Sequence, residues 1–234
     1  MTSVFVADTA EEAAAAATVH LRSAIEDARR ARGAAHVALA GGTTPRRTYE
    51  LLAAEIDDWT GVEVWFGDER AVGPDDPESN FRMASETLLA DGGGPNVHRI
   101  EGERGPEEAS AAYAAELEER LPIEDGVPVL DLALQGLGPD GHTASLFPGN
   151  PVVHATGTCV AVHHAPKPPP DRITLTVPVL RAARSIVFLA TGSEKADAVR
   201  GLLAGPNPDV PSSLLGGERT EVIVDRDAAP PGQP

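Results

Sequence analysis

The chain has 234 residues, of which 41% are hydrophobic and 24% are charged, a composition typical of a folded globular protein rather than a disordered one. Its 36 acidic and 19 basic residues leave a net charge of −17, which repels phosphate backbones and anionic lipid headgroups. The charge therefore argues against nucleic-acid and membrane-surface partners. An anionic small ligand would need a local group of basic side chains to offset this background.

The N-terminal segment and the cysteine content predict the compartment. Residues 1–17 contain neither a basic leader region nor a long apolar core, and no apolar run in the chain approaches about 18 residues. Cys159 is the only cysteine, so an internal disulfide is excluded, and its apolar neighbours predict a buried thiol. We therefore expect a cytoplasmic protein without a membrane segment.

Helix and strand signals alternate along the first half of the chain. Residues 8–33 predict a helix with an acidic first turn and an arginine-rich last turn. A strand at 36–40 runs into a glycine loop, and 41–56 continue as a helix with Thr44 as candidate cap and Pro45 at the first helical position. The remaining elements expected here are strands at 62–66 and 96–100 and helices at 79–94 and 106–121.

The alternation continues in the second half with one interruption. A long apolar strand is predicted at 127–138, and later elements are strands within 157–164, 172–180, 184–192 and 220–225 and a helix at 193–203. The proline-rich segment between Cys159 and the strand at 172–180 cannot be helical, so it predicts a local antiparallel pair or a projecting loop.

These elements define the expected fold class and domain organisation. Strands that alternate with helices predict parallel pairing, because parallel neighbours need a crossover that a helix supplies. The fold class is therefore α/β: a doubly wound, mostly parallel sheet with helices on both faces and a small local antiparallel excursion. We expect one domain over residues 1–228 and a frayed tail over 229–234.

Residue types that perform chemistry gather directly after predicted strands. Four such segments stand out, and they read GGTTP at 41–45, GDER at 67–70, GPDGH at 138–142 and TGSEK at 191–195. In open α/β sheets, ligands bind outside the carboxyl ends of the strands, where all four segments would lie together. This convergence is the main sequence indication of an enzyme.

The GGTTP segment is typical of an anion-binding loop. Gly42, Thr43 and Thr44 allow a close backbone approach at a helix N-terminus, where the helix dipole favours phosphate. It lacks the endings of nucleotide-binding loops, and an ordinary tight turn with a threonine cap is the alternative. The candidate cations are Arg70, Arg172 and Lys195, the last lying in a first helical turn where a lysine opposes the dipole.

His142 is the candidate general base. Asp140, two residues earlier, can orient the imidazole and stabilise its charged form, while Gly138 and Gly141 can present backbone amides to an oxyanion. A hydrogen-bonded loop histidine without a catalytic role is the alternative. Ser145 lacks the nucleophile-elbow pattern, and the other histidines show no metal-ligand spacing, so we expect neither a covalent serine route nor a metal.

With these motifs in hand, the chain resembles the 6-phosphogluconolactonase family over nearly its whole length. The segments that carry the resemblance occur in the family's order: LAGGTTPRRTYELL, VWFGDERAVGPDDPESNFRMASETLL, DLALQGLGPDGHTASLFPG, PKPPPDRITLT and TGSEKADAV. The resemblance implies a cytosolic, cofactor-free hydrolase that opens 6-phospho-D-glucono-1,5-lactone. Separately, we expect a monomer or weak homo-oligomer.

The resemblance also implies roles for individual residues. His142 would activate water beside Asp140, and Gly42, Thr43 and Thr44 would hold the phosphate; the remaining site residues would be Asp68, Arg70, Arg172 and Lys195. Two alternatives stay open: a deaminase or isomerase of the glucosamine-6-phosphate type and a non-catalytic sugar-phosphate sensor. Such deaminases carry an acidic residue five positions after the histidine, where this chain has Phe147.

Overall fold

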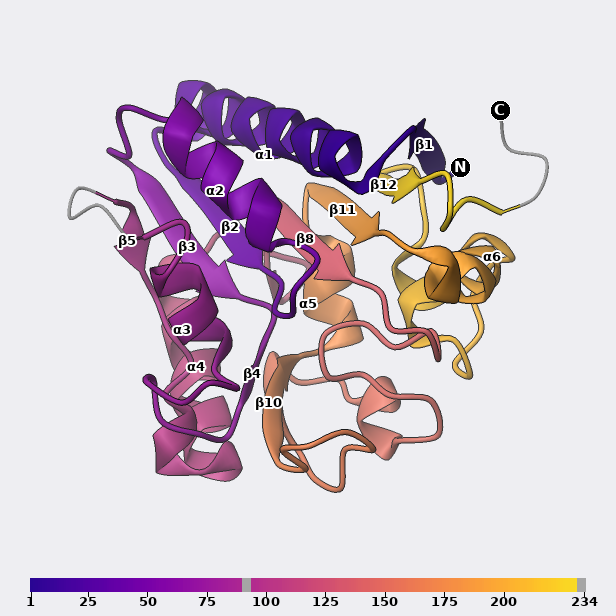
Figure 1. Ribbon diagram of the computed structural model, residues 1–234. Helices are drawn as coiled ribbons and strands as arrows, with labels where there is room; N and C mark the ends of the chain where they lie inside the picture. The colour runs from indigo at the N-terminus through magenta and orange to yellow at the C-terminus, as the bar shows by residue number, and fades with distance from the viewer. Residues whose placement is uncertain (90–93, 231–234) are drawn as a thin grey trace.

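A seven-stranded parallel sheet forms the centre of the computed structural model, which describes residues 1–89 and 94–230. The strand order is β1-β12-β11-β8-β2-β3-β5 (Figure 1). Their bounds are β1 Ser3–Ala7, β2 Ala35–Leu39, β3 Val62–Phe66, β5 Asn96–Val97, β8 Leu132–Gly136, β11 Ser185–Ala190 and β12 Thr220–Asp225. The predicted doubly wound, mostly parallel α/β class is confirmed.

Helices cover both faces of this sheet. Figure 1 shows α1 (Ala10–Arg32) and α2 (Arg46–Glu55) together on one face and α5 (Val177–Ala182) on the other. The long helix α1 forms where predicted, because Thr9 accepts a hydrogen bond from the Glu12 amide and Gly33 ends the helix in the left-handed region. The other helices are α3 Asn80–Ser85, α4 Pro106–Arg120 and α6 Ala196–Leu203, with short 3₁₀ turns at 102–104, 151–154, 193–195 and 211–215.

A small antiparallel sheet lies beside the main one and confirms the predicted excursion. Its strands are β9 (Cys159–Val162), β10 (Arg172–Leu175) and β4 (Asp68–Arg70), with β10 in the middle. β4 comes from the GDER segment, where no strand was predicted. β4 forms its hydrogen bonds with β10, about a hundred residues away in the sequence. No local sequence pattern therefore predicts this strand.

Several predicted elements need correction. Strand β1 was missed, because its five residues pair only with the last strand of the chain. The predicted strand at 127–138 is broken into β7 (Val127–Pro128) and β8, and β7 pairs with β6 (Ile123–Glu124) in a short hairpin. The predicted strand at 172–180 ends at Leu175, because α5 begins at Val177 with Pro178 in its first turn.

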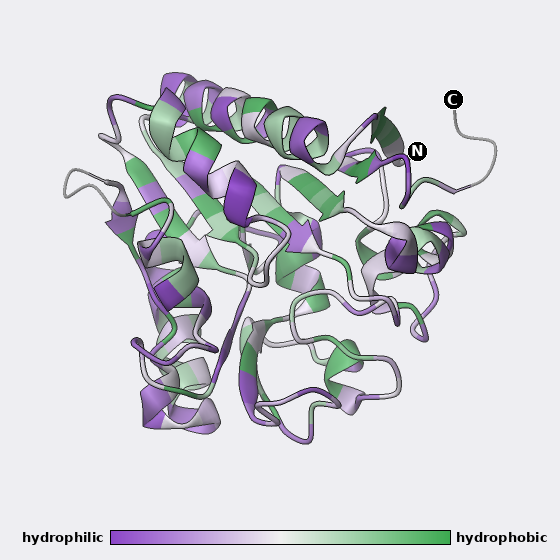
Figure 2. Cartoon of the chain, viewed as in Figure 1, coloured by the Kyte–Doolittle hydropathy of each residue, from purple (hydrophilic) through white to green (hydrophobic). Residues whose placement is uncertain are grey.

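One apolar core runs through the molecule. Its largest fully buried side chains are Trp65, Tyr49, Phe66, Phe147 and Phe188, and Cys159 is buried as predicted. Figure 2 shows hydrophobic residues along the central strands and alternating character along α1, as expected for a helix with one face on a sheet. Within the described residues no helix is long and apolar enough to cross a membrane, and residues 231–234 of the predicted tail lie outside the description.

Candidate functional site

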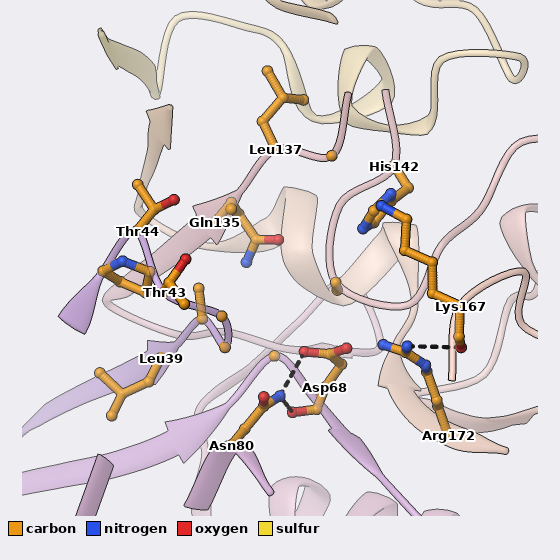
Figure 3. A pocket seen from close by; sticks show the side chains of 18 of the residues that line it. Leu39, Thr43, Thr44, Asp68, Asn80, Gln135, Leu137, His142, Lys167 and Arg172 are labelled. Carbon is orange, nitrogen blue, oxygen red and sulfur yellow. Dashed lines mark hydrogen bonds between the residues drawn. The ribbon is translucent and has the colours of Figure 1, made fainter. Parts of the chain in front are cut away.

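The loops that follow β2, β8 and β11, together with β4 and the β9–β10 connection, surround a cavity of about 280 Å³. Sequence reasoning named nine site residues, and eight of them line it: Gly42, Thr43, Thr44, Asp68, Arg70, His142, Arg172 and Lys195. Asp140 lies behind His142, outside the lining. Figure 3 shows Thr43 and Thr44 on one side of the cavity and His142 on the other. The parallel sheet thus brings together residues that are far apart in the chain.

The loop at 41–44 presents unused hydrogen-bond donors to this cavity. Within the described residues, the backbone amides of Gly42, Thr43 and Thr44 and the two threonine hydroxyls have no hydrogen-bond partner. Gly42 has φ +87°, a conformation that favours glycine. Thr44 does not cap α2, because Pro45 occupies the N-cap position and no side chain bonds the helix end. The loop therefore keeps its donors for an anion at the positive end of the helix dipole.

The imidazole of His142 is held from two sides. Its Nδ1 hydrogen-bonds Asp140 Oδ1, and its ring lies 4.6 Å, centroid to centroid, from the buried ring of Phe147. The turn that carries it is closed by the Gly138 amide, which donates to the His142 carbonyl at 2.8 Å. A Cβ atom at Gly138 would overlap the imidazole, so glycine is required there for steric reasons. With Nδ1 engaged, Nε2 is the nitrogen left to act in the cavity.

Opposing effects set the protonation of this pair. Burial lowers the pKa of His142 below its usual value, and Asp140 raises it only in part. The positive charge of Lys167 lowers the His142 pKa further. For Asp140, burial raises the pKa, but the hydrogen bond and charge of His142 outweigh that effect, so the net pKa is lowered. A neutral imidazole next to an ionised carboxylate is the state suited to a general base near pH 7.

Asp68 is a buried carboxylate whose position is fixed by two donors. Ser145 Oγ donates to Oδ2 at 2.6 Å and Asn80 Nδ2 donates to Oδ1 at 3.1 Å. Ser145 is fully buried and its hydroxyl is used by Asp68, which agrees with the expectation that it is not a nucleophile. Among the described residues, Asp68 is the one acidic side chain that lines the cavity.

Glu69, which sequence reasoning did not single out, links the GDER segment at 67–70 to the SN pair at 79–80. Its carboxylate accepts hydrogen bonds from the amides of Asn80 and Phe81 at the start of α3 and from the Ser79 hydroxyl. Burial raises the pKa of Glu69, although the backbone amides oppose this effect. The carboxylate thus joins β4 to α3 and holds Asn80 next to Asp68. This contact between a strand and a helix start is visible only in the fold.

Arg172 and the proline-rich connection form one unit. The guanidinium donates from Nε to the Pro169 carbonyl at 3.0 Å and from Nη2 to the carbonyls of Lys167 at 3.0 Å and Pro168 at 3.1 Å. Arg172 is only 5% exposed and its guanidinium lies 5.4 Å from the Phe147 ring centroid. These contacts give Arg172 a structural role in the connection, and because Arg172 also lines the cavity, its phosphate-binding role stays a prediction. They also bring Lys167, which sequence reasoning missed, to the cavity.

The cavity concentrates positive charge in a strongly acidic protein. Arg70, Lys167, Arg172 and Lys195 line it, against the single carboxylate of Asp68. The 19 basic residues of the chain comprise 17 arginines and only two lysines, and both lysines are here. Neither lysine side chain has a hydrogen-bond or ion-pair partner in the part of the chain that the structure describes, whereas many arginines are paired with carboxylates. This rarity of lysine is the signal in the sequence that points to Lys167.

Metal ligation finds no support in the described ranges 1–89 and 94–230, where no group of three or more His, Cys, Asp or Glu side chains is arranged to hold an ion. Two histidines outside the cavity lie between carboxylates instead: His98 between Glu63 and Glu116, and His163 between Asp171 and Glu107. These side chains form hydrogen bonds within the fold.

The lowered pKa of His142 leads to a measurable titration. We expect the imidazole to titrate below its ordinary value of 6.5, and Asp140→Asn to lower the His142 pKa further, because the carboxylate that stabilises the imidazolium is lost. Titration of the ring carbons by NMR measures both values. Asp171→Asn is the matched control, since Asp171 pairs with His163 and should leave the His142 titration unchanged. A His142 pKa that rises in Asp140→Asn would contradict this assignment.

Comparisons with known proteins identify the family of this chain. The family model described as glucosamine-6-phosphate isomerases/6-phosphogluconolactonase matches residues 8–224. The 6-phosphogluconolactonase of Streptomyces coelicolor is 42% identical over 206 residues, covering 82% of this chain and 79% of the relative, and that of Mycobacterium tuberculosis is 38% identical over 227 residues, covering 92% of each. The structure of 6-phosphogluconolactonase from Trypanosoma brucei superposes with a TM-score of 0.87 at 30% identity over 97% of both chains. The chain therefore belongs to the glucosamine-6-phosphate isomerase/6-phosphogluconolactonase family.

Proposed function

We propose that the protein hydrolyses 6-phospho-D-glucono-1,5-lactone to 6-phospho-D-gluconate, the second step of the oxidative pentose phosphate pathway. The observation that carries this proposal is the placement of a neutral base, His142, and an anion-binding loop, Gly42 to Thr44, in one cavity. The names of the relatives at 38–42% identity support the same activity. No cofactor or metal is required for ester hydrolysis by such a site.

The proposed reaction uses His142 first as a base and then as an acid. Nε2 removes a proton from a water molecule as its oxygen attacks C1, and the carbonyl electrons move onto the exocyclic oxygen. When the tetrahedral intermediate collapses, the bond from C1 to the ring oxygen breaks and the imidazolium protonates that oxygen. Asp140 keeps the proton on Nδ1 and stabilises the imidazolium between the two steps.

The phosphate group serves to position the lactone. We assign it to the unused amides and hydroxyls of Gly42, Thr43 and Thr44, with Arg70 and Lys195 supplying charge. Asp68, fixed by Ser145 and Asn80, would accept hydrogen bonds from sugar hydroxyls. Because the phosphate is remote from C1, its binding energy contributes by orienting the reacting carbon toward His142.

A deaminase or isomerase of the same family is the second candidate, and Phe147 disfavours it. A proton relay needs a second ionisable partner for the histidine besides Asp140, but the fully buried ring of Phe147 packs on the imidazole and cannot carry a proton. A sugar-phosphate sensor is a third possibility that explains the anion loop but not the oriented base. We propose further that the protein acts in the cytoplasm as a monomer or weak homo-oligomer.

The proposed activity is tested with freshly prepared lactone, corrected for spontaneous opening. We expect the wild type to accelerate hydrolysis and His142→Ala to lower kcat by about 10²–10⁴-fold, the usual contribution of a positioned base. His154→Ala, outside the cavity, is the matched control and should keep full activity. Release of ammonia from glucosamine 6-phosphate without lactone hydrolysis would support the deaminase instead, and full activity of His142→Ala would remove the histidine from the mechanism.

Gly138 generates a second expected result. We expect Gly138→Ala to reduce kcat about as much as His142→Ala does, because the added Cβ would displace the imidazole from Asp140. Gly42→Ala is unsuitable as a control, since Gly42 adopts positive φ, but Gly73→Ala meets open space and should be neutral. Kinetics and thermal melts of the wild type, Gly138→Ala and Gly73→Ala distinguish a displaced base from an unfolded protein. An active Gly138→Ala enzyme would contradict the assigned position of the ring.

Lys195 is expected to act on binding rather than on chemistry. Its ammonium is half-buried, and burial lowers its pKa, so an anionic partner compensates for lost hydration. We expect Lys195→Met to raise KM for the phosphorylated lactone by about tenfold or more, in the range of a charged hydrogen bond, with a smaller change in kcat. Steady-state kinetics measures this split, and an unchanged KM would exclude Lys195 as a phosphate ligand.

A further inference from the structure

The ammonium of Lys167 is the cation next to the proposed base. In Figure 3 the side chain runs from the backbone carbonyl held by Arg172 across the cavity to His142. Within the described residues its Nζ makes no hydrogen bond or ion pair, so its three donors are available to a ligand. Lys167 and His142 line the same cavity, and the charge of Lys167 lowers the pKa of His142.

The backbone that carries Lys167 is fixed from both ends. Arg172 holds three consecutive carbonyls of the connection, and the Ala165 amide donates to the Pro170 carbonyl at 2.9 Å. At the outer end, His163 hydrogen-bonds Asp171 at 2.9 Å and Glu107 of α4 at 2.8 Å. The position of the Lys167 backbone is therefore fixed by the proline-rich segment, although the lysine side chain itself is flexible.

The two arginines of the cavity are less suited to the reacting carbon, and Lys195 is assigned above to the phosphate. Arg172 donates from Nε and Nη2 to the loop carbonyls. Arg70 donates to the Glu78 carbonyl and lies beside the anion loop, since it also lines a second hollow formed with Gly42 and Thr43. Lys167 therefore combines free donors with a position beside the base.

We propose that Lys167 is a catalytic residue that stabilises the oxyanion at C1 and then binds the carboxylate of the product. This inference rests on the proposed lactone hydrolysis. As water attacks C1 and gives its proton to His142, the exocyclic oxygen gains the carbonyl electron pair, and Lys167 Nζ donates a hydrogen bond to it. When the ring oxygen leaves with the imidazolium proton, C1 becomes a carboxylic acid that loses its proton to water. The resulting carboxylate stays opposite the ammonium until release.

The test compares Lys167→Met with Lys195→Met, which removes the other lysine of the chain. Turnover of the lactone is measured, together with calorimetric binding of 6-phosphogluconate and of glucitol 6-phosphate, which carries a CH₂OH in place of the carboxylate. We expect Lys167→Met to lower kcat by about 10²-fold, as for loss of one oxyanion donor. It should weaken 6-phosphogluconate binding by about tenfold and leave glucitol 6-phosphate unchanged. Lys195→Met should weaken both ligands, because both carry the phosphate.

Three outcomes would overturn the proposal: unchanged kcat in Lys167→Met, unchanged binding of 6-phosphogluconate, or equal weakening of both ligands, which would make Lys167 a phosphate ligand. Far-UV circular dichroism and thermal melts confirm that both variants are folded, which is expected because the Lys167 side chain is exposed and unpaired. A wild type without lactonase activity would refute the proposed function separately. The binding comparison would then still decide whether Lys167 recognises a carboxylate.

Discussion

The parallel pairing of the central strands is the constraint on which the site depends. Because β2, β3, β8 and β11 run in the same direction, their carboxyl ends meet at one edge of the sheet, and the segments after them must share that edge. The anion loop at 42–44 and the turn that carries His142 follow the adjacent strands β2 and β8. The second sheet extends this edge with β4 and β10. It supplies Asp68 from β4, and Lys167 from the connection between β9 and β10.

Electrostatics explains how an acidic protein can take an anionic substrate. The net charge of −17 is spread over the surface, where arginines pair with carboxylates and salt screens what remains. Inside the cavity the balance reverses, because four basic side chains face one carboxylate. Within the described residues neither ammonium has a partner, and the desolvation of the half-buried Lys195 is compensated only when an anion binds. A local field of this kind selects for a compact, doubly anionic ligand over a long polyanion, which the surrounding surface repels.

Sequence reasoning predicted the parts of the structure that local patterns determine. Helix α1 was predicted from its caps, and eight of the nine candidate site residues line one cavity because strand-end motifs report the sheet edge. It failed where distant contacts decide the structure. Strand β4 exists because β10 pairs with it, and the capping of α3 by Glu69 needs both loops in place. The prediction of Thr44 as the helix cap was wrong, because Pro45 takes the N-cap position and α2 begins at Arg46, which leaves the Thr44 hydroxyl without a partner among the described residues.

Phe147 shows how one apolar side chain can decide between the chemistries open to this fold. Its ring packs against the imidazole of His142 and against the guanidinium of Arg172, so it touches both the base and the side chain that holds the Lys167 loop. An ionisable group in its place would share protons with His142 and bring a charge into a desolvated site. An apolar ring does the opposite, because it contributes to the burial that keeps the imidazole neutral and leaves Asp140 as its hydrogen-bonded partner. Water activation needs only that pair, whereas proton transfer along a sugar needs a second titrating group, so the packing of Phe147 favours hydrolysis on physical grounds.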